Sequence, residues 1–307
     1  MIICRGILVV FFMIATMANA QSEKNKATMN NGKKATIQVQ GHRGERGHLP
    51  ENTIQAFLGA LDKGVDVLEL DVVISQDGKV VVSHEPFMSA LYVSTSAGNP
   101  ITEETEKDYN LFKMDYDSIK KFDTGSRGNE NFPQQRKMRT YKPLLTEVFD
   151  AVEAKIAENG LKSVNYNIEI KSEPQEYGIS QPMPEAFVDL VIQVIKKKGM
   201  EKRINIQSFD PEILEVMHRK YPTIELAFLV GDKSLEENMK ALTFTPQIYS
   251  PYFKLITDTT TVNAVHKKQM KLIPWTVNTS QDILHMVKLG VDGIISDYPD
   301  RVLEILK

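Results

Sequence analysis

Three carboxylates stand in runs of sequence that otherwise have the composition of buried β-strands. Glu69 and Asp71 lie two residues apart in the run 67–72, so both side chains point to the same face of a strand. Glu169 repeats the pattern in a later run. Buried carboxylates repel one another unless a cation compensates them, and all-oxygen ligands favour Mg²⁺ or Ca²⁺ over Zn²⁺. The alternative is an ion network at the end of the sheet, neutralised by Lys171.

Two histidines and two further cations accompany these acids. His42 and Arg43 directly follow the first β-prone run, His84 ends another, and Lys171 lies two residues beyond Glu169. Imidazoles can act as acid and base on opposite sides of a reacting phosphorus. Arginine and lysine can hold the charge on its oxygens. With a divalent cation, these residue types are typical of phosphoryl-transfer chemistry.

A predicted hairpin brings one of the histidines to the acids. Asp77 and Gly78 stand between two β-branched runs, which is a strong signal for a tight turn and an antiparallel return arm. Pairing about this turn places His84 opposite Asp71. The segment 86–143 that follows does not fit the strand–helix rhythm, and we expect it to form an inserted subdomain that caps the active site.

Short β-rich runs alternate with amphipathic helical patterns over the rest of the chain. The eight predicted strands are 37–40, 67–72, 164–170, 204–208, 225–230, 247–250, 272–277 and 293–296. The predicted helices are 54–61, 144–157, 184–198, 211–221, 259–269 and 281–289. Eight such units in about 250 residues predict an α/β fold of the (βα)8 TIM-barrel type over 36–307, interrupted by the insertion. The alternative is an open doubly wound sheet, but no glycine-rich phosphate loop follows the first strand.

The first twenty residues have the pattern of a secretory signal peptide. Arg5 is their only charge, an apolar run occupies 7–17, and small residues precede a cleavage site after Ala20. The run is shorter than the roughly 20 apolar residues of a membrane span, although an uncleaved anchor is the alternative. We expect a flexible leader at 21–35 and an exported protein, periplasmic or secreted.

The composition is that of a folded soluble protein. Of its 307 residues 42% are hydrophobic and 25% charged, and the net charge is -3. These values argue against a disordered chain and against a basic nucleic-acid partner. The single cysteine, Cys4, allows no intramolecular disulfide, and cleavage after Ala20 would remove it and leave no thiolate for a metal site. We expect a small-molecule substrate and no stable membrane anchor, and the oligomeric state stays open.

Five blocks of sequence follow one another in order across nearly the whole chain after the leader. They are GHRGERGHLPENTIQAFLGALDKGVDVLELDVVISQDGKVVVSHE, NIEIK, IQSF, PWTVN and GVDGIISDYP. Together they closely resemble the glycerophosphodiester phosphodiesterase family. The resemblance implies a (βα)8 barrel with a small insertion after the hairpin, and hydrolysis of glycerophosphodiesters to sn-glycerol 3-phosphate and an alcohol.

The resemblance also implies roles for the residues that match the family's motifs. His42 and His84 fall on the acid/base histidines. Glu69, Asp71 and Glu169 fall on the ligands of one divalent cation, Ca²⁺ or Mg²⁺. Which histidine acts first as the base is open.

Further positions match the family's substrate-binding residues. Arg43 and Lys171 fall on phosphate-contacting cations, and Phe209 and Trp275 on aromatic positions near the substrate's glycerol. Barrel packing is the alternative for both aromatics. Glu51, in the PENT block, falls on an acid that we expect to support the site from behind.

Two departures from the family pattern concern the insertion. Glu85 follows His84 where members commonly have aspartate, and Tyr92-Val93-Ser94-Thr95 stands where an Arg-Thr-Thr-like run is frequent. These departures bear on the leaving group and on the contacts of the cap, rather than on the central chemistry.

Alternative functions and mechanisms remain compatible with the sequence. By similarity to phosphatidylinositol-specific phospholipases, we expect the substrate's own 2-hydroxyl to attack phosphorus, with direct attack by water as the alternative. We expect the apolar cap residues Phe87, Met88, Leu91 and Tyr92 to be exposed, which would suit a lipid or lysolipid phosphodiesterase of the lysophospholipase D-like or phosphatidylinositol-specific phospholipase C-like kind. A catalytically inactive barrel used for binding is a third possibility.

Overall fold

The computed structural model describes residues 37–307. The signal peptide predicted at 1–20 and the leader predicted at 21–35 lie outside the described residues and stay predictions. Within 37–307, no helix is both long enough and apolar enough to cross a membrane.

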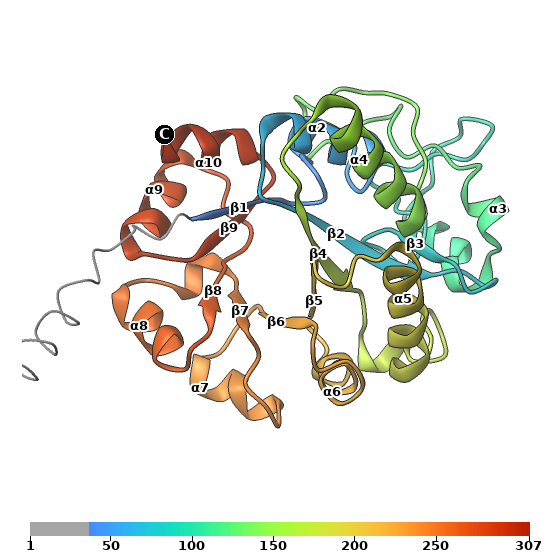
Figure 1. Ribbon diagram of the computed structural model, residues 1–307. Coiled ribbons are helices and arrows are strands. Elements are labelled where there is room, and N and C mark those ends of the chain that lie inside the picture. The colour runs from blue at the N-terminus through green and yellow to red at the C-terminus, as the bar shows by residue number, and fades with distance from the viewer. Residues whose placement is uncertain (1–36) are drawn as a thin grey trace, which may run out of the picture. The chain divides into compact units, whose positions relative to one another are not determined.

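Eight parallel strands form the inner ring of the fold, and the helices surround them (Figure 1). The parallel strands are β1 Gln38–Gly41, β2 Val67–Ile74, β4 Asn165–Ile170, β5 Ile204–Ser208, β6 Glu225–Val230, β7 Ile248–Pro251, β8 Lys271–Leu272 and β9 Gly293–Ser296. Their order is β8-β7-β6-β5-β4-β2-β1-β9. The amide of Asp292 donates to the carbonyl of Leu272, and that of Ile295 to Pro274, so hydrogen bonds also join the two ends of the order. The predicted (βα)8 barrel is confirmed.

The strand predicted at 272–277 is wrong in its extent. Regular pairing covers only Lys271–Leu272, and the chain then continues in an irregular extended form. Pro274 supplies the physical reason, because it has no N–H to donate to a neighbouring strand. The segment still contacts both neighbours, since the amide of Trp275 donates to Pro251 and that of Val277 to Ile295.

The helices pack their apolar faces against the outside of the barrel. They are α2 Ile54–Lys63, α4 Leu145–Asn159, α5 Pro184–Lys198, α6 Pro211–Lys220, α7 Leu235–Asn238, α8 Thr259–Lys267, α9 Ser280–Leu289 and α10 Pro299–Leu306. The sequence reading missed α10, although Pro299 in its first turn and the buried Val302 are ordinary helix signals. The main core is the layer between strands and helices, where Phe57, Phe149 and Phe187 are fully buried.

The hairpin forms, but its register differs by one residue from the predicted register. Strand β3 Val80–Val82 pairs antiparallel with β2, with Val72 opposite Val82 and Ile74 opposite Val80. The amide of Ser83 donates to the carbonyl of Asp71, so Ser83, and not His84, lies opposite Asp71. The reason is the turn, which is closed by a bond from the Ser75 amide to the Lys79 carbonyl and therefore centres on residue 77.

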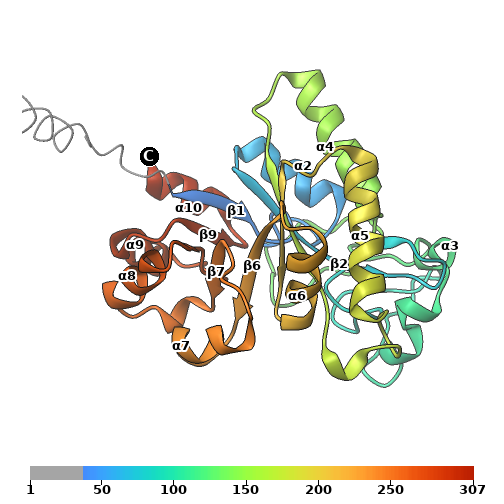
Figure 2. The same ribbon diagram turned by 60° about the horizontal axis from the view of Figure 1, so that its bottom comes forward.

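The segment between β3 and α4 has its own apolar cluster. Its regular elements are only the short helices η1 Glu106–Tyr109, η2 Leu111–Lys113 and α3 Tyr116–Ile119. Figure 2 shows the segment gathered at one side of the barrel, beyond the β2–β3 hairpin. Val73 and Val81 of the hairpin share the cluster with buried residues of the segment, which are Met88, Tyr92, Val93, Ile101, Leu111, Tyr116 and Ile119. The segment therefore packs on the outer face of the hairpin rather than standing alone.

The predicted exposure of apolar residues in this segment is wrong in part. Met88 is 0% exposed and Tyr92 4%, because both belong to the cluster against the hairpin. Phe87 and Leu91 are half-buried and pack against the same cluster.

We predict that the insertion and the barrel unfold together. Leu111→Ala should lower the free energy of unfolding by about 2–5 kcal/mol, because it leaves a cavity in the cluster that the hairpin shares. Urea unfolding followed by circular dichroism and by tryptophan fluorescence should give one coincident transition, shifted to lower urea. A separate early transition in the variant would contradict this shared cluster.

Candidate active site

Three carboxylates meet at the C-terminal ends of neighbouring strands. Asp71 of β2 and Glu169 of β4 are partners in the parallel register, and Glu69 lies on the same face as Asp71. One oxygen of each lies within 4.8 Å of the others, and all three residues are buried. Asp71 Oδ1 is buried without a hydrogen-bond partner among the described residues. An unpaired oxygen within an all-carboxylate cluster fits a divalent cation of the Ca²⁺ or Mg²⁺ type.

The three carboxyl groups differ in how well their charge is compensated. Burial, followed by repulsion from Asp71 and Glu169, raises the pKa of Glu69 well above its ordinary value. Burial also raises the pKa of Glu169, although Lys171 opposes it. Burial acts in the same direction on Asp71, but attraction, above all to Arg43, outweighs it and holds the pKa of Asp71 well below its ordinary value. Without a cation, Asp71 carries the negative charge and the two glutamates retain protons to higher pH.

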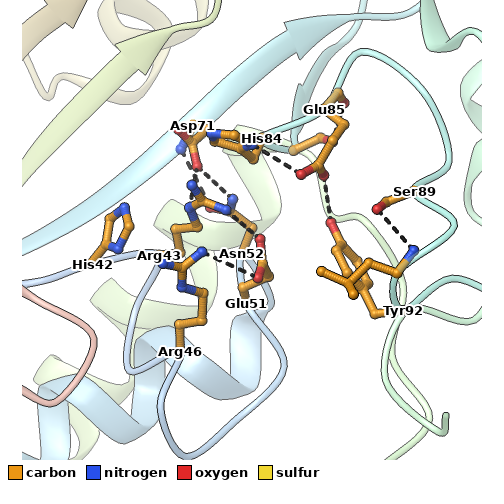
Figure 3. Close-up of polar contacts among 12 residues, drawn as sticks. His42, Arg43, Arg46, Glu51, Asn52, Asp71, His84, Glu85, Ser89 and Tyr92 are labelled. Atoms are coloured by element: carbon orange, nitrogen blue, oxygen red, sulfur yellow. Dashed lines mark hydrogen bonds and ion pairs between the residues drawn. The ribbon is translucent and has the colours of Figure 1, made fainter. Parts of the chain in front are cut away.

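The loop after β1 uses both its backbone and a side chain to hold these acids. Arg43 has a φ of 51°, in the left-handed region, and its N–H donates to Glu69 Oε2 at 2.8 Å. Its guanidinium donates from Nη1 to Glu51 Oε1 at 2.6 Å, and Nε lies 3.3 Å from Asp71 Oδ2 (Figure 3). The positive charge expected at Arg43 is therefore beside the carboxylate cluster, already oriented by two acids.

The residues of the PENT block each have a separate structural task. Glu51 accepts the hydrogen bond from Arg43 on one carboxylate oxygen, and its other oxygen, Oε2, lies 3.7 Å from Nη1 of Arg46. Asn52 has a φ of 54° and donates from Nδ2 to Asp71 Oδ2 at 2.8 Å. Thr53 caps α2 by accepting a hydrogen bond from the backbone of the first turn. The helix start is thus coupled to the acids, and Glu51 contacts them through Arg43.

His42 is fixed by a carboxylate that the sequence reading did not select. Its Nδ1 lies 2.6 Å from Oδ1 of Asp297, which directly follows β9, the neighbour of β1. Arg46 Nε donates to the same Oδ1 at 2.8 Å, and Asn278 Nδ2 donates to Oδ2 at 2.7 Å. Burial raises the pKa of Asp297, but the hydrogen bond from His42 and attraction to Arg46 outweigh it and hold that pKa well below its ordinary value. An ionised carboxylate only accepts, so Nδ1 of His42 is the donor.

The proton on Nδ1 leaves the other ring nitrogen of His42 free to act as a base. Nε2 lies 3.9 Å from Glu69 Oε2, at the edge of the carboxylate cluster. Burial, followed by the charge of Arg46, lowers the pKa of His42 to about 4, although Asp297 opposes the shift. Arg46 thus offsets the negative charge of Asp297. The imidazole of His42 is therefore neutral at pH 7, with its lone pair on Nε2.

His84 has a different environment, although it reaches the same cluster. Its side chain is 32% exposed, and Nδ1 lies 3.0 Å from Glu85 Oε1. Figure 3 shows His84 and His42 apart from each other, with Asp71 between them. The one-residue change in register therefore does not remove His84 from the site.

A pocket of about 780 Å³ is lined by His84 and by three other predicted site residues, which are Glu169, Lys171 and Phe209. Lys171 Nζ, which lines it, lies 2.8 Å from Glu169 Oε1 and 5.8 Å from the centroid of the Phe209 ring. Phe209 is 40% exposed on the pocket wall, and its ring packs edge to face on Trp275. Trp275 donates from Nε1 to a backbone carbonyl and does not line this pocket. Phe209 is thus placed to touch a ligand, whereas Trp275 supports it.

Buried amides fill the barrel beneath the carboxylates. Gln207 Nε2 donates to Glu69 Oε1 at 2.8 Å, and its own Oε1 accepts from Asn167 Nδ2 at 2.9 Å. The same Nδ2 lies 2.9 Å from Gln40 Oε1, and Asn205 donates to Asn167 Oδ1. The sequence reading missed this network, although each of these amides stands in a predicted strand. The network fixes the side chain of Glu69 from below.

Comparisons with known sequences give the family. The model of the glycerophosphoryl diester phosphodiesterase family matches residues 42–301. Glycerophosphodiester phosphodiesterases from Caldanaerobacter subterraneus subsp. tengcongensis and from Bacillus altitudinis are each 33% identical to this chain. The alignments cover 88% and 86% of this chain, and 97% and 96% of the relatives.

Comparisons with solved structures agree. A Silicibacter pomeroyi protein described as a glycerophosphoryl diester phosphodiesterase superposes with a TM-score of 0.78 at 29% identity, over 90% of this chain and 94% of that one. An Oleispira antarctica phosphodiesterase, solved with its product sn-glycerol-3-phosphate, has the same fold, with a TM-score of 0.68 at 22% identity over 88% and 97% of the two chains. The chain therefore belongs to the glycerophosphoryl diester phosphodiesterase family, a family of phosphoric diester hydrolases.

Proposed function

We propose that this protein hydrolyses glycerophosphodiesters to sn-glycerol 3-phosphate and an alcohol, and that the reaction depends on a divalent cation. The observation that carries the proposal is the cluster of Glu69, Asp71 and Glu169 with its unpaired buried oxygen, flanked by His42 and His84. The activity of the relatives and the product bound to the Oleispira antarctica enzyme support the choice of substrate.

The three carboxylates would hold the cation, and two side chains would help to bind the phosphate. A divalent cation at this position supplies positive charge that stabilises the phosphoryl oxygens. Lys171, on the pocket wall, offers a second positive charge to the same oxygens. Arg43 is 8% exposed and bound to Glu51, so its first effect is to keep Asp71 ionised, and its contact with phosphate is secondary.

The environments of the two histidines support different roles. His42 is neutral, and Asp297 fixes its Nδ1 proton, so its Nε2 is ready to accept a proton from the attacking hydroxyl. His84 lines the open pocket, and the alcohol must leave into open space. We therefore assign His42 as the first base and His84 as the acid that protonates the leaving alcohol.

The attacking hydroxyl is the substrate's own 2-hydroxyl in this proposal. Attack by that hydroxyl forms a cyclic phosphate and releases the alcohol, and water then opens the ring with the roles of the histidines exchanged. Direct attack by water is the alternative. A substrate without the 2-hydroxyl separates the two, because undiminished turnover would rule out the internal nucleophile.

One observation favours a second candidate function on apolar substrates. Ile179 is 53% exposed and lines the pocket with Phe209, so the space for the leaving group has apolar walls. A lysolipid could place its apolar part there. The burial of Met88 and Tyr92 removes part of the support that the sequence offered for this function, whereas the half-buried Phe87 lines the same pocket.

We predict that the purified protein, stripped with EDTA, releases sn-glycerol 3-phosphate only after Ca²⁺ or Mg²⁺ is restored. The loss in EDTA should be at least roughly 100-fold, because the phosphoryl oxygens then lack the positive charge that the cation would supply. The activity is measured by enzymatic detection of the sn-glycerol 3-phosphate that is released from choline, ethanolamine and inositol diesters. A lysophospholipid serves as a further substrate. Cleavage of the lysophospholipid alone would support the second function, and full activity in EDTA would refute the metal site.

We predict that the roles assigned to the two histidines can be distinguished by comparing substrates with different leaving groups. His84→Ala should lower kcat by roughly 100-fold or more on glycerophosphocholine, but much less on a 4-nitrophenyl diester, whose leaving group needs no proton. His42→Ala should be impaired on both substrates. Steady-state kinetics with the two substrates tests this, and Glu153→Gln, which lies away from the site in a pair with Arg203, is the matched control. The reverse pattern would exchange the two roles.

A further inference from the structure

The carboxylate of Glu85 is shared between the catalytic centre and the insertion. One oxygen, Oε1, lies 3.0 Å from His84 Nδ1, and the other accepts a hydrogen bond of 2.8 Å from the Tyr92 hydroxyl. Attraction to His84, with Lys142 and Arg43 contributing, outweighs burial and holds the pKa of Glu85 well below its ordinary value. Glu85 is therefore an ionised acceptor on both sides. Figure 3 shows it between His84 and Tyr92.

Lys142, at the other end of the insertion, faces the same group. It is 4% exposed, and its Nζ donates to Ser83 Oγ at 2.8 Å and lies 3.5 Å from the Tyr92 hydroxyl. Ser83 in turn donates to the backbone carbonyl of Glu85 at 2.6 Å. Burial lowers the pKa of Lys142, and Glu85 is the acid that most opposes this shift and favours the charged form of the lysine. The insertion thus contributes a donor and a cation to one carboxylate.

We propose that the inserted segment completes the catalytic centre. Tyr92 is a positioning residue: it holds Glu85 in the conformation that orients His84. Lys142 lies beside the Tyr92 hydroxyl. The inference rests on the proposed role of His84. A glutamate side chain has three rotatable bonds, and a carboxylate bonded only to a half-exposed imidazole would adopt several conformations. The bond from Tyr92, whose ring is fixed in the apolar cluster, removes that freedom.

Glu85 and Tyr92 are two of the places where the sequence departs from the family pattern, and they meet here in one hydrogen bond. An aspartate at position 85 would be one methylene shorter, which would reduce its reach from the imidazole towards Tyr92. Glutamate at 85 and tyrosine at 92 therefore form a matched pair. The insertion acts on the reaction through this pair, in addition to covering the hairpin.

The test is Tyr92→Phe in the full-length enzyme, which removes one hydroxyl and keeps the ring. Its kcat on glycerophosphocholine should fall by roughly 10-fold, a part of the loss expected for the acid itself, while KM stays within about 2-fold. Tyr116→Phe is the matched control, because Tyr116 lies in the same cluster and also donates to a glutamate, Glu147, away from His84. The Tyr116→Phe variant should lose as much stability as Tyr92→Phe does, and it should keep the kcat of the wild type.

A double-mutant cycle separates positioning from a general structural effect. If Tyr92 acts through Glu85, then Tyr92→Phe should change kcat by less than about 2-fold when Glu85→Gln is already present. An unchanged kcat in Tyr92→Phe, or an equal loss in both backgrounds, would overturn the proposal. An equal loss of kcat in Tyr116→Phe would also overturn it. Wild-type enzyme without diesterase activity, or full activity of His84→Ala, would instead refute the proposed function.

Discussion

The mutual repulsion of three buried carboxylates is the constraint on which the rest of the site depends. Glu69, Asp71 and Glu169 lie close together at the end of a barrel, where water cannot solvate them fully. Their neighbours relieve only part of that cost. Arg43 compensates Asp71, and the amides of Asn52 and Gln207 donate to single oxygens. We expect a bound divalent cation to relieve the electrostatic cost that remains.

The two histidines are held by different parts of the chain. His42 depends on the closure of the barrel, because Asp297 follows the last strand and His42 follows the first. His84 depends on the hairpin and on the insertion that packs against it. In the proposed mechanism, a change in the insertion would therefore alter the protonation of the leaving alcohol by His84 and leave His42, the proposed base, unaffected.

The sequence allowed prediction of the barrel and of the carboxylate cluster because both follow from short-range periodicity. Two acids at a spacing of two must share a face, and strands that alternate with helices must lie parallel. The register of the hairpin was not predictable in the same way, because the Asp-Gly signal does not show how many residues the turn includes. The fixed positions of Asp297, Asn52 and Tyr92 depend on contacts between residues far apart in sequence. Asp297 and Asn52 stand inside recognised blocks, but spacing alone does not indicate that Asp297 faces His42 and that Asn52 faces Asp71.

The most direct test of this account is calorimetric titration of the metal-free enzyme with Ca²⁺ and with Mg²⁺, repeated in buffers of different ionisation enthalpy. The raised pKa values of Glu69 and Glu169 mean that the empty site holds protons that a cation must displace. We expect one cation per chain, net release of protons on binding, and an affinity that weakens as the pH is lowered. Glu69→Gln should bind far more weakly, whereas Glu153→Gln should bind as the wild type does. Binding that releases no protons and does not change with pH, or absence of binding, would contradict it.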